Sequence, residues 1–506
     1  MICRWNKSTI GRVGGIWLGA KCYNKPVRKI EQFLFYFLLF AIPFQTRKIL
    51  WHQNWNFNEW QSISIYGTDL ILLALFVFWA FNYFQARKFL ISNFKFLQRF
   101  PALRGNLLRA NKSKFQNPNF YLFILVIVSI VSIKNSSSYI LSVYSVLKLV
   151  EFIVFYFYIK NYAVYRFGLI GPMIALICGG LFQAIIAILQ FFKQSDLGLR
   201  YLGESVLAFN LTGVASFYNL YGEKIMRAYG TTPHPNILAA YLFLAIFAFY
   251  FVYLYFHIYH LPAQAGQNKI YHPKFNLFIL TSYSLILLSL FFTFARVMIF
   301  LWFAGFIIRS CLILGKQRFR KIFSVGINKV KLVRILTIST VVVVLFGIFY
   351  WPEAVSRVKI SSGEEAVQLR NFYNKESLKS LNWFGVGSGN FVNWLMVKDP
   401  NLPRSIYQPV HNIYLLVYSE TGIFGISALV VFLFFLVKDF VLRTRMKKLY
   451  HFSFLLVFLS VLFMGLFDHF LWTLQQGRFV FWLAVALLTV FKDSDIMVRQ
   501  QSEPTA

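Results

Sequence analysis

The chain has 506 residues, of which 58% are hydrophobic, 20% are aromatic and only 14% are charged. A soluble domain carries about a quarter charged residues, so this composition argues against a soluble protein. The formal net charge of +33 invites a nucleic-acid partner. However, the Lys and Arg residues lie in separate clusters between apolar segments, as they do in the cytoplasmic loops of membrane proteins. We therefore expect a membrane protein with no nucleic-acid partner.

The segment 1–29 is strongly basic and lacks an adequate apolar core for a signal peptide. It is predicted to be a cytoplasmic N-terminal segment that precedes an uncleaved first membrane span. Apolar runs that approach the ~20 residues needed to cross the hydrocarbon layer then recur along the chain. The twelve predicted spans are 30–46, 66–86, 119–133, 139–159, 168–192, 235–258, 275–294, 297–314, 333–351, 411–437, 452–469 and 472–491.

The connections between these spans predict the orientation of the chain. With the N-terminus inside, the cytoplasmic connections carry about twice as many basic residues as the external ones, as the positive-inside rule requires. Both termini are thus expected to be cytoplasmic, with 492–506 as a cytoplasmic tail. The predicted fold class is an all-α polytopic membrane protein. It has a single transmembrane domain over 30–491 and two long external loops, at about 193–234 and 352–410.

Loops longer than ~15 residues are usually functional, so we expect function on the external face. Within the second long loop, segment 364–381 places Ala366, Leu369 and Tyr373 on one helical face. This pattern predicts an amphipathic helix on the membrane surface.

Two opposite charges lie inside the fourth span. Lys148 and Glu151 are three residues apart and therefore meet on one helix face. A neutralising structural pair is the favoured interpretation, because either charge alone would be costly in lipid. The alternative is that the pair lines a groove for a lipid carrier. The sequence does not define the depth of Arg478, a further charge in the last hairpin.

The first polar stretch at a predicted membrane boundary runs from Arg227 to Asn236 and leads into a long apolar helix. Pro235 suits the first helical turn, and His234 or Asn236 is a candidate helix cap. For His234 this structural role is favoured over a catalytic one. The next stretch is the tight turn before Arg296. This arginine either extends its side chain to the interface or faces a polar cavity, where it would be functional.

Two further stretches follow in and after the second long loop. Arg370 precedes the run Gly385-x-Gly387-x-Gly389, which lacks the strand and helix of a nucleotide-binding loop and is expected to form a compact turn. His411 and Asn412 then enter the tenth span, followed by Glu420. A histidine at this boundary either caps a helix or acts as a general base near neutral pH.

Other kinds of chemistry find little support in the sequence. We see no clustered His or Cys metal ligands, no Walker motif and no Ser/His/Asp arrangement, and the external carboxylates are dispersed. No metal and no cofactor are therefore expected. Arginines and one histidine suit a donor with a pyrophosphate leaving group, because guanidinium groups bind phosphate oxygens bidentately.

In combination, these stretches resemble the signatures of the O-antigen ligase/O-antigen polymerase superfamily. The similarity runs in order from about residue 220 to 490. It rests on Arg227…Gly230…His234-Pro-Asn236, Arg296, Arg370 ahead of Phe384–Phe391, His411-Asn412…Glu420…Gly422…Gly425, and Asp468…Trp472…Gln475-Gln-Gly477. Ala295 stands where the family often has Ser or Thr.

The resemblance implies a bacterial inner-membrane enzyme whose active site faces the periplasm or exterior. It would transfer a glycan, with inversion, from a polyprenyl-pyrophosphate such as undecaprenyl pyrophosphate to an acceptor hydroxyl on a glycan or lipid-linked acceptor. His411 would be the catalytic base, and Arg227, Arg296 and Arg370 would bind the pyrophosphate. The supporting residues would be His234, Asn236, Asn412 and Glu420. Ligase and polymerase share this donor chemistry, so the sequence does not separate them.

Two other classes of function compete with glycan transfer. A transporter or flippase of lipid-linked glycans also needs many spans and interior cations, but we see no inverted repeat and no cluster at mid-membrane. A scaffold for envelope assembly would not bring Arg227, Arg296 and His411 together. The enzyme hypothesis predicts that these three residues converge at one external cavity.

Overall fold

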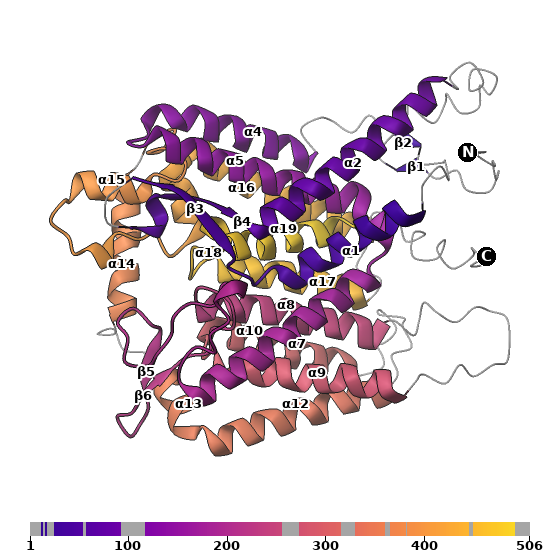
Figure 1. Ribbon diagram of the computed structural model, residues 1–506, viewed down its shortest axis with the longest axis vertical. Helices are drawn as coiled ribbons and strands as arrows, with labels where there is room; N and C mark the ends of the chain where they lie inside the picture. Colours follow the sequence, from indigo (N-terminus) through magenta and orange to yellow (C-terminus); the bar gives the residue numbers. More distant parts are fainter. Residues whose placement is uncertain are drawn as a thin grey trace.

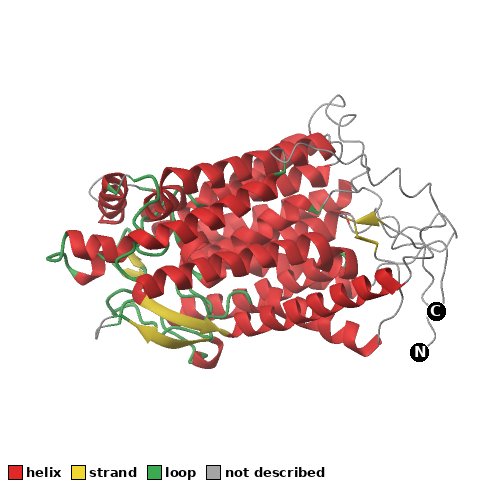
Figure 2. Cartoon of the chain, turned by 90° about the horizontal axis from the view of Figure 1, so that it is seen from above, coloured by secondary structure: helices red, strands yellow, loops and turns green. Residues whose placement is uncertain are grey.

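The computed structural model describes residues 12–13, 16–17, 25–53, 57–92, 117–255, 273–314, 329–359, 365–380, 382–444 and 449–490. Within these residues, long helices pack side by side in a bundle (Figures 1 and 2). The predicted tail 492–506 and most of the basic segment 1–29 lie outside the described residues.

The helices follow the predicted apolar segments closely. They are α1 (Lys25–Ala41), α2 (Gly67–Ser92), α4 (Pro118–Ser132), α5 (Tyr139–Tyr158), α6 (Val164–Phe167), α7 (Ile170–Lys193), α8 (Pro235–Tyr255), α9 (Pro273–Phe292), α10 (Arg296–Leu314), α12 (Lys329–Phe349), α13 (Trp351–Val358), α14 (Glu365–Lys379), α15 (Phe391–Lys398), α16 (Ile413–Thr444), α17 (Leu449–Met464), α18 (Phe470–Thr473) and α19 (Gln475–Thr489). The described residues also form three short antiparallel hairpins that the sequence did not predict. They pair β1 (Arg12–Val13) with β2 (Ile16–Trp17), β3 (Arg47–His52) with β4 (Ser62–Tyr66), and β5 (Ser216–Tyr218) with β6 (Lys224–Met226).

Eight helices within the described ranges are long and apolar enough to cross a membrane, in agreement with a multi-pass membrane protein. They cover Gly67–Phe84, Pro118–Asn135, Tyr139–Phe167, Ile170–Lys193, Pro235–Leu254, Lys274–Phe292, Val330–Phe349 and Ile413–Thr444. Two shorter apolar helices cover Arg296–Ile308 and Tyr450–Met464. The number of twelve spans and the inside–outside orientation stay predictions.

The last predicted span, 472–491, is not one continuous helix. Leu474 separates α18 from α19 with extended backbone angles, φ −101° and ψ 144°. Gly477 allows this break, because a Cβ atom there would lie 2.0 Å from the carbonyl oxygen of Phe470. Arg478 lies in the first turn of α19, where its Nε donates a hydrogen bond to the carbonyl oxygen of Trp472 at 2.7 Å.

Helix α8 lies at the centre of the bundle, and its apolar part is completely buried. It is apolar on all sides and contacts α7, α9, α10, α12, α17 and α19, as expected for a helix surrounded by others. Small residues permit close packing, since a Cβ atom on Gly180 of α7 would lie 2.5 Å from the Cβ of Ala245. The beginning of α8 is thus held firmly in place by the core.

One end of the bundle carries β3–β6 and the helices α13, α14 and α15, together with the loops between them (labelled in Figure 1; the same end is seen from above in Figure 2). We call this the loop end. Both predicted long loops, 193–234 and 352–410, contribute to it. On α14, Tyr373 is buried and Leu369 packs beside it, against Phe391, Leu395 and Leu416. The predicted amphipathic helix therefore exists, but its apolar face covers α15 and α16. Its location on the membrane surface stays a prediction, and the side chain of Ala366 lies outside the described residues.

The predicted pair of Lys148 and Glu151 is present and has a third member. Lys148 Nζ lies 2.9 Å from Glu151 Oε2 and 2.6 Å from Asp69 Oδ2 on α2. It also donates to Gln475 Oε1 of α19 at 3.3 Å. The cluster therefore ties α2, α5 and α19 together, which supports the structural interpretation over a carrier groove.

We expect Lys148→Met to destabilise the protein by up to about 3 kcal/mol, because it leaves two partly buried carboxylates without their cation. Thermal unfolding of the detergent-solubilised chain measures the loss. Lys134→Met is the matched control, since Lys134 is exposed and surface changes of this kind stay within about 0.5 kcal/mol. Unchanged unfolding of Lys148→Met, with weakened binding of the lipid carrier, would instead support the groove.

Candidate active site

His234 and Asn236 are placed by the first turn of α8. The backbone N–H of Asn236 donates a hydrogen bond to His234 Nδ1 at 3.2 Å, so the imidazole caps the helix, as predicted. The side chain of Asn236 has a different role. Its Oδ1 accepts a hydrogen bond from Arg227 at 2.6 Å, and its Nδ2 donates to Asp468 Oδ2 at 2.8 Å. Asn236 thus connects an arginine to a carboxylate on a distant loop.

Arg227 follows directly after β6, and its side chain is buried. Its Nε donates a hydrogen bond to the carbonyl oxygen of Thr293 at 2.7 Å. Two N–H donors of the Arg227 guanidinium therefore form hydrogen bonds with protein oxygens, and these bonds fix the plane of the guanidinium group. Burial and the nearby charge of Arg357 lower the pKa of Arg227.

Arg296 begins α10, directly after the turn that contains Thr293 and Phe294. Phe294 adopts a left-handed φ of 45°, a strained conformation for an aromatic residue and one that is typical of functional sites. Arg296 Nε donates to the carbonyl oxygen of Arg357 at 2.7 Å. The charge of Arg296 also contributes to the lowered pKa of Arg227. The turn therefore places the two predicted arginines close together.

His411 lies just before α16, where Asn412 caps the helix. Asn412 Oδ1 accepts hydrogen bonds from the backbone N–H groups of Tyr414 at 2.9 Å and Leu415 at 3.2 Å, so its supporting role is to fix the backbone beside His411. The ring of Tyr373 meets the His411 ring edge-on, with centroids 5.5 Å apart. Among the described residues, the buried Nδ1 of His411 has no hydrogen-bond partner.

Asp468 and His469, between α17 and α18, complete the cluster. The rings of His411 and His469 stack with centroids 4.8 Å apart and planes 14° apart. His469 Nδ1 is 2.8 Å from Thr473 Oγ1, and Asp468 Oδ1 accepts the backbone N–H of His469 at 2.8 Å. His469 directly follows Asp468 within the stretch from Asp468 to Trp472 that contributes to the resemblance, and the resemblance assigns neither residue a role. The signal that could have found them is two adjacent titratable residues placed between two apolar helices.

The surroundings set the protonation states of this cluster. Burial lowers the pKa of His411 below its usual range, and the charge of Arg370 acts in the same direction. Burial also lowers the pKa of His469 to about 3. Burial alone would raise the pKa of Asp468, but the neighbouring histidines and the Asn236 amide outweigh it and lower the pKa to about 2. At neutral pH the cluster therefore combines a carboxylate with neutral imidazoles.

The expectation that no metal ligands cluster is wrong. One potential ligand atom from each of His411, Asp468 and His469 lies within 4.8 Å of the others. The arrangement suits a tetrahedral metal site poorly, because imidazole lone pairs lie in the ring planes and these two planes are nearly parallel, 14° apart. We assign this cluster no metal.

Arg370 and Glu420 differ in their relation to the site. The charge of Arg370 on α14 lowers the pKa values of both His411 and His234, so its side chain lies near them. Glu420 lies on α16 beside the kink at Gly422, where φ is 71°. It accepts hydrogen bonds from the backbone N–H groups of Gly389, in the glycine run, and of Phe391. Glu420 therefore fixes the end of the glycine run against α16.

The glycine run forms the predicted compact turn. Gly385, Gly387 and Gly389 have φ values of 71°, 103° and 70°, which only glycine adopts readily. The backbone N–H of Gly387 donates to the carbonyl oxygen of Glu420 at 3.1 Å. A Cβ atom on Gly385 would lie 2.3 Å from the carbonyl carbon of Glu420. The turn thus packs directly on α16, close to the residues that follow His411.

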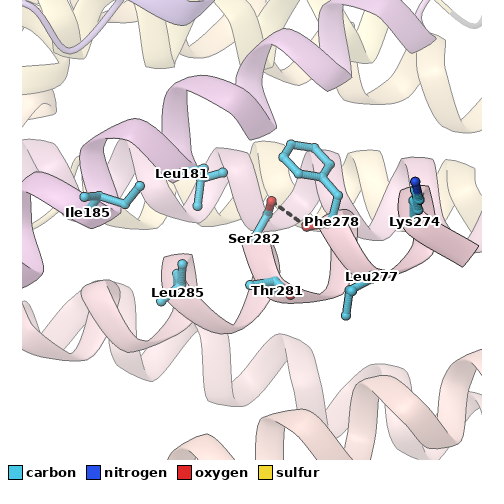
Figure 3. Close-up of a pocket in the computed structure, with 8 residues that line it drawn as sticks. All are labelled: Leu181, Ile185, Lys274, Leu277, Phe278, Thr281, Ser282 and Leu285. Atoms are coloured by element: carbon cyan, nitrogen blue, oxygen red, sulfur yellow. Dashed lines mark hydrogen bonds between the residues drawn. The ribbon is translucent and has the colours of Figure 1, made fainter.

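Figure 3 shows a pocket elsewhere in the protein, between α7 and α9. Apart from Lys274, Thr281 and Ser282, its lining is apolar, and it shares no residue with the cluster at the loop end. The structure thus links Arg227 to His411 through Asn236 and Asp468 and brings Arg296 and Arg370 near them.

The chain was also compared with known proteins. No protein-family model and no curated protein matches it.

Proposed function

We propose that the chain transfers a glycan from a polyprenyl-pyrophosphate carrier to an acceptor hydroxyl. The observation that carries this proposal is the hydrogen-bonded series Arg227–Asn236–Asp468, which ends beside His411. It connects an arginine that can bind a phosphate group with a neutral imidazole that can accept a proton. Asn236, the middle of the series, lies in the first turn of α8, a helix that its neighbours hold in place.

In the proposed reaction, Arg227 and Arg296 bind the diphosphate of the donor through charge-assisted hydrogen bonds. The acceptor oxygen attacks the anomeric carbon, and the bond from that carbon to the diphosphate oxygen breaks. Polyprenyl diphosphate leaves with the bonding electrons. An attack opposite the leaving group inverts the anomeric configuration.

His411 takes the proton of the attacking hydroxyl. Its imidazole is neutral at neutral pH because burial lowers its pKa, so it is ready to accept a proton. Asp468 lies close enough to stabilise the imidazolium that forms. Arg370 lies near His411 and is the third residue proposed to contact the diphosphate or the bound glycan.

The proposal also covers the location of the reaction. The loop end would face the periplasm or exterior of a bacterial inner membrane, with twelve spans and both termini in the cytoplasm. The donor reaches such a site within the membrane, so no cytosolic nucleotide and no cofactor are needed. The acceptor is a glycan or a lipid-linked molecule.

Mass spectrometry of envelope glycans from a deletion strain tests this function. Loss of chain extension identifies a polymerase, and accumulation of full-length carrier-linked chains identifies a ligase. Carrier-linked glycan retained on the cytoplasmic face would identify a flippase and contradict the proposal. An unchanged glycan profile would contradict it as well.

Transfer should proceed without a divalent metal, because arginines supply the charge that binds the diphosphate. We expect the purified chain to keep its activity in excess chelator. The group of His411, Asp468 and His469 makes this experiment informative, since it is where a metal would bind. Complete loss of transfer, restored by Zn²⁺, Mg²⁺ or Mn²⁺, would show that the site is a metal centre.

A further inference from the structure

A groove runs along the surface of the bundle between α7 and α9 (Figure 3). Leu181 and Ile185 belong to its wall on α7, and they lie on one face of that helix because they are four residues apart. Ile185 is 46% exposed, and Leu277 on the opposite wall is 68% exposed. The volume of the groove is about 370 Å³, within the range of small-molecule sites. The groove is therefore open to whatever surrounds the bundle.

The wall on α9 follows from the spacing of its side chains. Lys274, Leu277, Thr281 and Leu285 succeed one another at intervals of three or four residues. This spacing places them in one row on a helix, and Figure 3 shows Lys274 at one end of the row. Beyond Lys274 the row is apolar except for Thr281. The groove thus has one charged end and a largely apolar length.

The depth of the groove matches one leaflet of a bilayer. Both of its walls belong to helices that can cross a membrane, Ile170–Lys193 and Lys274–Phe292. From Lys274 to Leu285 the helix rises about 16 Å, roughly half of the ~30 Å hydrocarbon layer. At the other end of α9, the carbonyl oxygen of Phe292 accepts the backbone N–H of Ala228, in the loop before α8, at 3.1 Å. Lys274 therefore lies at the end of the bundle opposite the loop end.

The charge at this end of the groove has no counter-charge. Lys274 is exposed, and no described residue forms an ion pair or a hydrogen bond with its side chain. It also lies in the first turn of α9, where a helix carries a partial positive charge. An anion complements this end, and a hydrocarbon chain complements the rest. Basic pockets between membrane helices bind anionic lipid headgroups in this way.

We propose that the groove binds one anionic phospholipid from the leaflet opposite the loop end. An acyl chain lies between the walls of α7 and α9, and the headgroup phosphate pairs with the Lys274 ammonium. A zwitterionic phospholipid fits the same groove, but its headgroup has no net charge to complement the lysine. This site is separate from the proposed active site and does not depend on glycan transfer.

The bound lipid would bridge two helices that hold the segment after Arg227. On α7, Gln190 Nε2 donates a hydrogen bond to the carbonyl oxygen of Gly230 at 2.9 Å, and α9 holds Ala228 through Phe292. A ligand that binds only the folded chain stabilises it. The phospholipid should therefore stabilise the pairing of α7 and α9 and raise the unfolding temperature.

The test uses a phosphatidylglycerol that carries a photoreactive group on one acyl chain. The purified full-length chain is placed in phosphatidylcholine nanodiscs that contain a rising fraction of this probe. We expect crosslinks on the peptides of α7 and α9 that line the groove. Lys274→Ala should require about five times as much probe for the same crosslinking, the effect of one lysine at an anionic membrane surface. Lys29→Ala is the matched control, because Lys29 is an exposed lysine near the beginning of α1, at the same end of the bundle.

A second variant tests the groove itself. Thr281→Trp fills the groove at an exposed position and should abolish these crosslinks, whereas Val333→Trp on α12, which is 56% exposed and outside the groove, should not. Phosphatidylglycerol should also raise the unfolding temperature above its value in phosphatidylcholine alone, and Lys274→Ala should remove the difference.

Three results would overturn the proposal. Equal losses in Lys29→Ala and Lys274→Ala would show a general attraction of the basic surface for anionic lipid. Crosslinks that fall on other helices, or that survive Thr281→Trp, would show that the chain does not lie in the groove. An unfolding temperature that ignores phosphatidylglycerol would exclude a stabilising site. Glycan transfer enters none of these measurements, so the lipid site and the proposed function can fail independently.

Discussion

Replacing His411 with alanine should reduce glycan transfer by about 10²–10⁴-fold, the contribution of a general base. The chain should still insert and fold, because the hydrogen bonds of Asn412 hold the beginning of α16. Transfer is measured with the purified chain and a carrier-linked donor. His52→Ala is the control, since His52 is an exposed histidine of the loop end. Near-normal turnover of the His411 variant would leave this histidine with a structural role only.

His411 should also determine the pH at which transfer activity declines on the acid side of the pH profile. A protonated imidazole cannot accept the acceptor proton, so activity falls as the pH drops through the pKa of His411. Because burial and Arg370 lower that pKa, the midpoint should lie below ~6.5, the value for an exposed histidine. Arg370→Gln removes one of the two causes and should shift the midpoint upward. An unshifted acid limb in that variant would indicate that another group titrates.

Replacing Arg227 with alanine should have the second large effect, a loss of about 10²–10³-fold in transfer, as for other donors that stabilise developing negative charge. Arg227 also binds Thr293 and Asn236, so its loss frees the amide that positions Asp468. Arg227→Lys should recover little, because an ammonium cannot reproduce the planar fork.

Two controls separate charge from structure in this experiment. Arg404→Ala removes an exposed arginine of the loop end and should leave transfer unchanged. Asn236→Ala keeps Arg227 but breaks its connection to Asp468, so it should lower transfer less than Arg227→Ala does. Equal activity of Arg227→Ala and the unaltered chain would exclude this arginine from the donor site.

Helix positions were predictable because an apolar run long enough to cross the hydrocarbon layer must satisfy its backbone hydrogen bonds internally, as a helix does. The predicted span 235–258 corresponds to α8, and Pro235 marks its first residue in both. The break at Leu474 was not predictable in this way, because it depends on the approach of Phe470 to Gly477. Hydropathy alone predicts one continuous span across such a break.

The residues of the candidate site were likewise predictable only where local sequence identifies them. Arg227, Arg296 and His411 were found because each stands at a boundary between apolar and polar sequence. Asp468 and His469 were not assigned roles, because these depend on contacts between distant segments. Asn236 and Asp468 are 232 positions apart, yet they share a hydrogen bond.

The most direct measurement uses the purified chain in proteoliposomes with a polyprenyl-pyrophosphate-linked glycan. Two acceptors are offered separately, a second carrier-linked glycan and a lipid-linked oligosaccharide. We expect one of them to gain the glycan through an inverted linkage, with one free polyprenyl diphosphate released for each glycan transferred, and no product from His411→Ala. Movement of the donor across the membrane without cleavage, or no release of polyprenyl diphosphate by the folded chain with either acceptor, would contradict this account.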